Sequence, residues 1–395
     1  MNIKELTDIM LRLCREALSG GAEPTEALPL DEVTLEQLYA LSSAHDMAHL
    51  LSYALYRRGA LNVQDGVGAR FYKAQLLAVY RAEQHRVVSE RLYATLEEAG
   101  VSFIPLKGAV LRALYPEGWM RTSCDIDLLV QKEDVARVEA LLSERLSFVS
   151  QGALTEHDCL LISPEGVHLE LHHTLIEDRE GGAELCAVLD GVSDRAQPEQ
   201  GYTYRRLMSD EDFYFYHVAH IAKHFRIGGC GARALLDTYL LLLADAPSKE
   251  ATKAQLEKGG LAPFAKALER LARVWFGDEE HDEVTVWMAD YILRGGVYGN
   301  VKTLAQQKSA AHGGSRARYL LARLFLSRQM LITMYPALKK RPWLAPYYQV
   351  CRWLRILLRG TWRRGSAADQ MREVLRVDRD KAELTAQMLA RLELK

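Results

Sequence analysis

Cys124-Asp125-Ile126-Asp127-Leu128-Leu129-Val130 places two acids at the start of an apolar run. Residues 126–130 are mostly apolar and predict a short buried strand. Because side chains of a strand alternate between its two faces, Asp125 and Asp127 project to the same side. Two adjacent carboxylates repel each other and lose hydration, which is unfavourable unless a cation compensates. Taken alone, the pair has two interpretations: a metal site, or an acidic loop that leads into a strand.

The segments around this strand alternate between predicted strands and helices. The Pro and Gly of Ser163-Pro164-Glu165-Gly166 suit the turn of a hairpin. Interleaved strands and helices of this kind predict a compact α/β layer. The predicted strands are 101–106, 126–130, 147–150, 159–162 and 167–175, and the predicted helices between them are 107–115 and 132–144.

The rest of the chain is predicted to be helical. Residues 35–43 and 71–99 show apolar residues at three- and four-residue spacing, whereas the polar stretch 176–203 is predicted as a surface connection. Further helices are predicted over 210–226, 231–246, 250–258, 261–275, 283–294, 315–334, 344–359 and 366–392.

The expected fold class is therefore α+β and mostly helical, with a mixed sheet in its α/β core. A chain of 395 residues favours two or three domains. We expect an N-terminal helical region over 1–84, the α/β core over 85–205 and a C-terminal helical domain over 206–395.

A third carboxylate lies in Val167–His173. Alternation along a strand places His168, Glu170 and His172 on one face. A two-metal site for nucleotidyl transfer needs two bridging acids and a third acid that completes one metal site and helps to deprotonate the attacking hydroxyl. Oxygen ligands favour Mg²⁺, with Mn²⁺ as the alternative.

The segment upstream of the paired acids contains four candidates for binding phosphate. Lys107 and Gly108 lie where a predicted strand passes into a helix, and glycine permits a close approach of the backbone to a ligand. Arg121 and Ser123 directly precede the paired acids and could reach a phosphate tail.

FIPLKGAVLRALYPEGWMRTSCDIDLLV (103–130), followed by VHLELHHTL (167–175), resembles the bacterial uncharacterised nucleotidyltransferases of the DNA polymerase β-type superfamily. The resemblance extends over residues 85–240. It implies a minimal nucleotidyltransferase fold and Mg²⁺-dependent transfer of a nucleoside monophosphate from an NTP to a hydroxyl or another acceptor. By position, Asp125 and Asp127 match the metal-binding acids and Glu170 matches the third acid.

The chain departs from the superfamily at the phosphate-binding turn. Lys107 and Gly108 stand where the superfamily usually has Gly-Ser, and Ala109 replaces a serine that often contacts the triphosphate. Either Lys107 substitutes as a phosphate contact, or nucleotide binding is weakened. The second case suggests an alternative function, a weak or inactive nucleotidyltransferase fold that acts as a binding or scaffold module.

Histidines recur in the predicted helix 210–226. His217, His220 and His224 share one helical face, and Lys223 is nearby. Three interpretations remain open: a metal site of a histidine-based hydrolase, contact with substrate or phosphate, and structural histidines. The resemblance favours a helix that lines the cleft. His220, Lys223 and His224, together with His172, are therefore substrate-side candidates.

The positive charge of the chain is concentrated near its C-terminus. Residues 291–368 contain 15 Lys or Arg and no Asp or Glu, although the formal net charge of the whole chain is −2. An RNA or an anionic membrane surface could bind through 339–364. Alternatively, the basic face of this segment could pack against the remainder of the chain, which carries the acids. The near-neutral whole-chain pI of 6.7 favours an anionic small or polymeric acceptor over broad binding of nucleic acid.

Cysteine usage and hydropathy favour the cytoplasm. Six scattered cysteines without a CxxC pair predict reduced thiols. The N-terminal segment mixes bases and acids and does not resemble a signal peptide. The apolar run 234–246 contains two aspartates and is too short to span a bilayer.

Overall fold

The computed structural model describes residues 1–20, 28, 30–151, 158–176, 178–226, 230–244, 249–296, 325–326, 331, 335, 338, 341–359 and 379–394. It divides into two compact units. The first comprises Met1–Lys223 and Gly231–Leu293, and the second comprises His224–Cys230 and Arg294–Lys395. The expected boundaries at 84/85 and 205/206 both lie within the first unit, and the three-part division stays a prediction.

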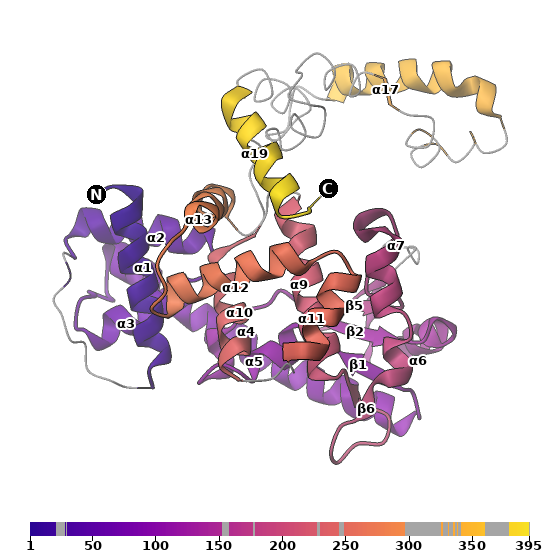
Figure 1. Ribbon diagram of the computed structural model, residues 1–395. Helices are drawn as coiled ribbons and strands as arrows, with labels where there is room; N and C mark the ends of the chain where they lie inside the picture. The colour runs from indigo at the N-terminus through magenta and orange to yellow at the C-terminus, as the bar shows by residue number, and fades with distance from the viewer. Residues whose placement is uncertain are drawn as a thin grey trace. The chain divides into compact units, whose positions relative to one another are not determined.

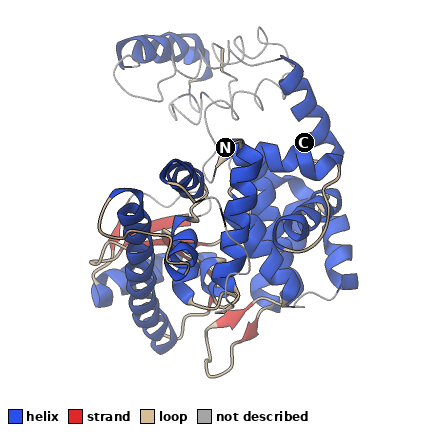
Figure 2. Ribbon diagram, turned by 90° about the vertical axis from the view of Figure 1, so that its left-hand side faces the viewer, coloured by secondary structure: helices blue, strands red, loops and turns tan. Residues whose placement is uncertain are grey.

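A five-stranded mixed sheet lies in the first unit, among many more helices (Figure 2). Its strands are β1 Phe103–Pro105, β2 Asp125–Val130, β3 Val149–Ser150, β4 Asp158–Ile162 and β5 His168–His172. The order is β1-β2-β5-β4-β3, in which β2 and β5 are parallel and the other neighbours are antiparallel. The mostly helical α+β class with a mixed sheet is therefore confirmed.

One face of the sheet packs on two helices, α4 Gly66–Glu98 and α6 Val135–Leu146, which lie close to the strands in Figure 1. Leu128 of β2 and Leu169 and Leu171 of β5 are completely buried in this core. Since strand side chains alternate, the residues between them point to the other face. That is why the acids of β2 and β5 lie opposite the apolar core.

Helices make up most of the remaining described chain. Side chains cap the first two: Asn2 forms a reciprocal capping box with Glu5, and the carboxylate of Asp31 accepts the N–H of Thr34. No described helix has the length and apolarity needed to cross a membrane. These helices are α1 Ile3–Leu18, α2 Glu32–Ala44, α3 Ala48–Arg57, α9 Asp210–Arg226, α10 Ala232–Leu243, α11 Lys249–Lys258, α12 Ala262–Phe276 and α13 Glu283–Gly295.

The prediction that 176–203 is a surface connection is wrong. This stretch forms the helices α7 Asp178–Leu189 and α8 Val192–Arg195, followed by β6 Gln197–Pro198, which pairs with β7 Arg206–Leu207. Leu185, Val188 and Leu189 follow helical spacing and are buried. Glycines and acids between them conceal this short apolar stripe in the sequence.

The helix that follows β1 is shorter than predicted. Instead of 107–115, the structure has α5 Gly108–Arg112, followed by the 3₁₀ turn η1 Gly118–Met120. A helix of five residues has few aligned peptide dipoles, so an argument for phosphate binding from its N-terminus is weakened. A second 3₁₀ turn, η2 Lys132–Asp134, precedes α6.

In the second unit, the described helices are α17 Ala345–Arg359, preceded by η4 Pro342–Leu344, and α19 Arg379–Arg391. The predicted helix 344–359 is therefore confirmed. Most of the predicted helix 315–334 lies outside the described residues, as does the part of 366–392 before residue 379.

Candidate metal and nucleotide site

The carboxylates meet where β2 and β5 run side by side. In this parallel pair Asp127 lies opposite Glu170, and Asp125 lies opposite His168. Register partners of neighbouring strands project to the same face. The sheet therefore brings residues more than 40 positions apart in the sequence onto one face, as the alternation in each segment predicts.

Asp127, Glu170 and His172 form a compact group of metal-binding side chains. One ligand atom from each lies within 4.8 Å of the other two. The Nε2 of His172 is 3.1 Å from Oδ1 of Asp127 and 3.4 Å from Oε2 of Glu170. Two carboxylates and an imidazole fit Mn²⁺ as well as Mg²⁺. Asp125 adjoins this group but does not belong to it, so the third close donor is a histidine that was predicted only as a substrate-side residue.

Lys107 supplies a cation to the same group. Its Nζ lies 3.6 Å from Oδ1 of Asp127 and 5.9 Å from the ring centre of Tyr216 on α9. Lys107 has φ 23°, a value rare for residues with a Cβ. The N–H of Leu106, donated to the carbonyl of Asp127, fixes the turn beside β2.

The predicted phosphate-binding residues are close together. A Cβ at Gly108 would lie 3.5 Å from Nη1 of Arg121 and 3.5 Å from Oγ of Ser123. This is ordinary van der Waals distance, so the contact itself does not demand glycine. The fold does bring the turn after β1 against the segment that precedes the paired acids.

The pKa values of the ionisable groups in the site depend strongly on the neighbouring charges. Burial, together with the charges of Asp127 and Glu170, raises the pKa of Asp125 to about 6. Burial also opposes ionisation of Asp127, but Lys107 and His172 outweigh it and lower the pKa of Asp127 to about 2. Burial disfavours the charged form of His172, yet its bonds to Asp127 and Glu170 raise its pKa to about 9.

Lys107 shows the same competition. Burial disfavours its charge, but Tyr216 and then the three carboxylates raise its pKa above the ordinary value. Asp127 thus remains ionised next to two cationic side chains. The site can hold negative charge without a metal ion, and its cations can also meet an anionic ligand.

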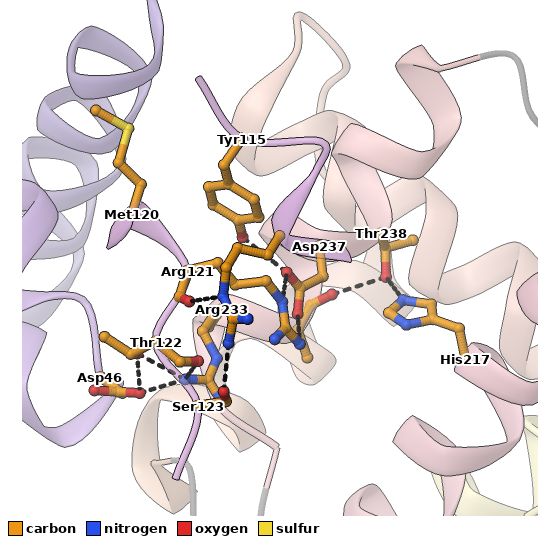
Figure 3. A network of polar contacts seen from close by, with 12 residues as sticks. Asp46, Tyr115, Met120, Arg121, Thr122, Ser123, His217, Arg233, Asp237 and Thr238 are labelled. Atoms are coloured by element: carbon orange, nitrogen blue, oxygen red, sulfur yellow. Dashed lines mark hydrogen bonds and ion pairs between the residues drawn. The ribbon is translucent and has the colours of Figure 1, made fainter. Parts of the chain in front are cut away.

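Arg121 lies in a buried polar network next to the site (Figure 3). Its Nε and Nη2 donate to the two oxygens of Asp237 at 2.9 and 3.1 Å, and the hydroxyl of Tyr115 donates to Asp237 at 2.8 Å. Ser123 accepts a bond of 2.7 Å from Arg112. Two predicted phosphate contacts thus have partners inside the protein, and their contact with phosphate stays a prediction. Sequence spacing indicated neither Tyr115 nor Arg112.

The histidines of α9 are divided between different environments. His217 is buried and bonded to the hydroxyl of Thr238 at 2.9 Å, and burial lowers its pKa to about 4. His220, Lys223 and His224 are half-buried, and the ring of His220 is tilted against Tyr216. Within the described part of the chain, the α9 histidines form no group that could hold a metal. The structural interpretation fits His217, and the substrate-side role of the other three stays a prediction.

A mixed sheet with paired acids on β2 and a third acid on the adjacent parallel strand is the arrangement expected of a nucleotidyltransferase core. The chain belongs to the family of uncharacterised nucleotidyltransferases, whose model matches residues 31–277. This match spans all five strands of the sheet and the helices from α2 to α12. Searches among curated proteins and among solved structures found no match.

Proposed function

We propose that the chain is a Mg²⁺-dependent nucleotidyltransferase, which transfers a nucleoside monophosphate from an NTP to a hydroxyl acceptor. The observation that carries this proposal is the register of β2 and β5, which puts Asp127 opposite Glu170 with the ammonium of Lys107 against Asp127. Carboxylates that can hold a divalent cation thereby lie beside a lysine ammonium group that can bind phosphate.

In this proposal Glu170 has two roles and each of the other residues has one. A bound Mg²⁺ or Mn²⁺ would neutralise phosphate charge and orient the α-phosphate. Asp127 and Glu170 would hold that ion, with Asp125 and His172 beside them, and Lys107 would bind the phosphates that leave. The acceptor oxygen bonds to the α-phosphorus while the bond from that phosphorus to the β-bridging oxygen breaks. The carboxylate of Glu170, whose side chain is 35% exposed, takes the hydroxyl proton, and pyrophosphate departs.

The test is incubation of the full-length protein with each α-³²P-labelled NTP, Mg²⁺ and a cell extract. Wild type should label an acceptor, and Asp127→Asn should reduce the labelling rate about 100-fold or more, because charge stabilisation at the phosphate is lost. Glu144→Gln is the matched control, since Glu144 is exposed on α6 at the other face of the sheet. Equal labelling by wild type and Asp127→Asn would refute the proposal.

A binding or scaffold module is the second candidate. Ala109 stands at the phosphate-binding turn, and Lys107 and His172 already compensate the charge of Asp127. Calorimetry separates the two candidates. A transferase must bind Mg²⁺-NTP, and Asp127→Asn must weaken that binding. Binding without any labelled product supports the module, and no binding of any Mg²⁺-NTP excludes transfer.

The basic segment 291–368 supports a separate proposal, contact with an anionic partner. Trp343 and Tyr347 are 73% and 62% exposed in η4 and α17, which lie within 339–364. Aromatic and basic residues together favour an anionic membrane surface or an RNA. Co-sedimentation with phosphatidylserine vesicles and gel shift with RNA test the two partners, with phosphatidylcholine vesicles as the control. Binding should weaken with added salt. If the protein binds neither the vesicles nor the RNA, the result favours the other interpretation, in which the basic face packs against the more acidic remainder of the chain.

A further inference from the structure

A cavity of about 500 Å³ opens at the carboxyl ends of β2 and β5. Leu129 and Gln131 line it from the end of β2, and residues 173–176 line it after β5. Residues 186, 187 and 189–194, from α7, α8 and the turn between them, complete the lining. Volumes of this size are typical of sites for small molecules. None of the residues that line it belongs to the candidate metal site.

The cavity adjoins the acids through β2. Leu129 lines the cavity and is the register partner of His172, the histidine that contacts Asp127 and Glu170. Leu129 is two residues beyond Asp127 on the same face of the strand. Two strand residues span about 7 Å, so a small molecule in the cavity can extend a hydroxyl group to the acids.

The described lining carries carboxylates but no Lys or Arg. Asp190 and Asp194 are both exposed residues of this lining. The guanidinium of Arg195, close to Gly191, is bound to Asp212 and to the carbonyls of Val188 and Asp190. The pair Arg195–Asp212 is neutral overall, and the two carboxylates remain to repel an anion.

Other lining groups suit a hydroxylated ligand. Thr174 and Ser193 offer hydroxyl groups, and Gln131 offers an amide. Leu129, Ile176 and Val192 supply apolar surface for the carbon skeleton of such a ligand. Donors, acceptors and apolar contacts are thus combined in one small volume.

We propose that this cavity binds the acceptor, a small polyhydroxylated molecule that is neutral or carries an amine and has no negative charge. This inference rests on the proposed nucleotidyl transfer and replaces the expectation of an anionic acceptor. It separates the two substrates by charge. The triphosphate lies against Lys107, and the acceptor lies beyond Leu129, next to Asp190 and Asp194.

The first test measures the charge preference of the cavity and needs no knowledge of the ligand. Cys186 lines the cavity and is half-buried. The full-length protein is treated with trimethylammonioethyl or sulfonatoethyl methanethiosulfonate, and modification of Cys186 is followed by peptide mass spectrometry. The rate of Cys186 with each reagent is divided by the rate of 2-mercaptoethanol with the same reagent. This ratio should be about five-fold or more higher for the cationic reagent. Cys351, which lies in the basic segment, should show no such preference in the same digest.

Variants show whether the two carboxylates cause this preference. Asp190→Asn combined with Asp194→Asn should abolish it. Glu144→Gln combined with Glu280→Gln is the control with the same change in charge, because both glutamates are exposed and neither lies within ten residues of the cavity lining in sequence. The proposal would be overturned if Cys186 showed no preference for the cationic reagent. It would also be overturned if the preference were unchanged in Asp190→Asn/Asp194→Asn.

The second test separates failure of the cavity from failure of the nucleotide site. N-ethylmaleimide modifies Cys186 in the cavity and Cys124, which is exposed and precedes Asp125. At millimolar concentration, glucosamine or methyl glucoside should slow modification of Cys186. The rate in the presence of either sugar should be at least about three-fold lower than the rate in the presence of glucose 6-phosphate. Mg²⁺-NTP should instead slow modification of Cys124.

Protection of Cys124 by Mg²⁺-NTP with no protection of Cys186 by either sugar overturns the acceptor cavity and leaves the nucleotide site standing. Protection of Cys186 alone supports the charge-selective cavity and contradicts the transferase. Stronger protection of Cys186 by glucose 6-phosphate than by the uncharged sugar would also overturn the proposal, because the cavity would then prefer an anion.

Discussion

At the scale of single residues, Lys107 contributes most to the character of the site. It directs a positive charge to Asp127, and its backbone has φ 23° and ψ −86°. Such a conformation costs on the order of 1–3 kcal/mol for a residue with a Cβ. A position suited to glycine thus carries a lysine, which indicates that the side chain serves the site rather than the turn.

Substitution of Lys107 can separate charge from backbone strain. Lys107→Ala and Lys107→Gly should both weaken Mg²⁺-NTP binding about ten-fold, because each removes the same charged contact. Lys107→Gly should be more stable than Lys107→Ala by about 1 kcal/mol, since glycine tolerates the positive φ. Calorimetry and urea unfolding measure the two effects. Lys132→Ala, at an exposed position of η2, should change neither, and equal stability of the two Lys107 variants would argue against strain.

At the scale of elements, the segment that precedes β2 is held by a buried ion pair and by a second, partly exposed one. Arg121 and Tyr115 bind Asp237 of α10 (Figure 3). Arg233, also on α10, contacts Asp46 and the carbonyl and hydroxyl of Thr122. α10 thus anchors the chain directly before Asp125, and we infer that this contact positions the acids.

Asp237→Ala should destabilise the protein by about 3–5 kcal/mol, because it leaves Arg121 charged and buried without its partner. Tyr115→Phe should cost about 1.5 kcal/mol for the lost bond to a carboxylate. Urea unfolding measures both. The double variant Arg121→Met/Asp237→Leu removes both charges and should recover part of the loss. A double variant as unstable as the sum of the single variants would show that the pairing is not the source of the effect.

At the scale of the whole molecule, buried histidines link stability to pH. Burial lowers the pKa of both His45 and His217 to about 4, from an ordinary value of 6.5. The unfolded chain therefore binds protons first as the pH falls. Stability from these histidines is complete above pH 6.5 and is lost between pH 6.5 and 4.

His217→Gln keeps a group able to bond Thr238 but cannot take up a proton. Between pH 6.5 and 5, its free energy of unfolding should fall less steeply than that of wild type, by up to about 1.4 kcal/mol per pH unit. Urea unfolding at several pH values gives the slopes. Identical slopes for His217→Gln and wild type would contradict a neutral, buried His217.

Much of the fold was predictable because it depends on local pattern. The strands at 126–130 and 159–162 and the helix 210–226 show clear apolar runs or helical spacing, and the structure contains each within a residue or two. The helix Asp178–Leu189 was not predicted, because its few apolar residues are separated by acids and glycines. Its burial comes from tertiary contacts that the local sequence does not reveal.

The alternation of side chains in the sequence was enough to predict that Asp125 and Asp127 share a face and that Glu170 lies on a strand of matching alternation. The tertiary structure was needed to show that Asp127 is the register partner of Glu170, that His172 rather than Asp125 completes the closest group, and that Arg121 is bound to Asp237. Alternation is a property of one strand and can be predicted from a few residues. Register, ion pairing and the cavity beyond Leu129 depend on segments far apart in the chain, and only folding brings those segments together.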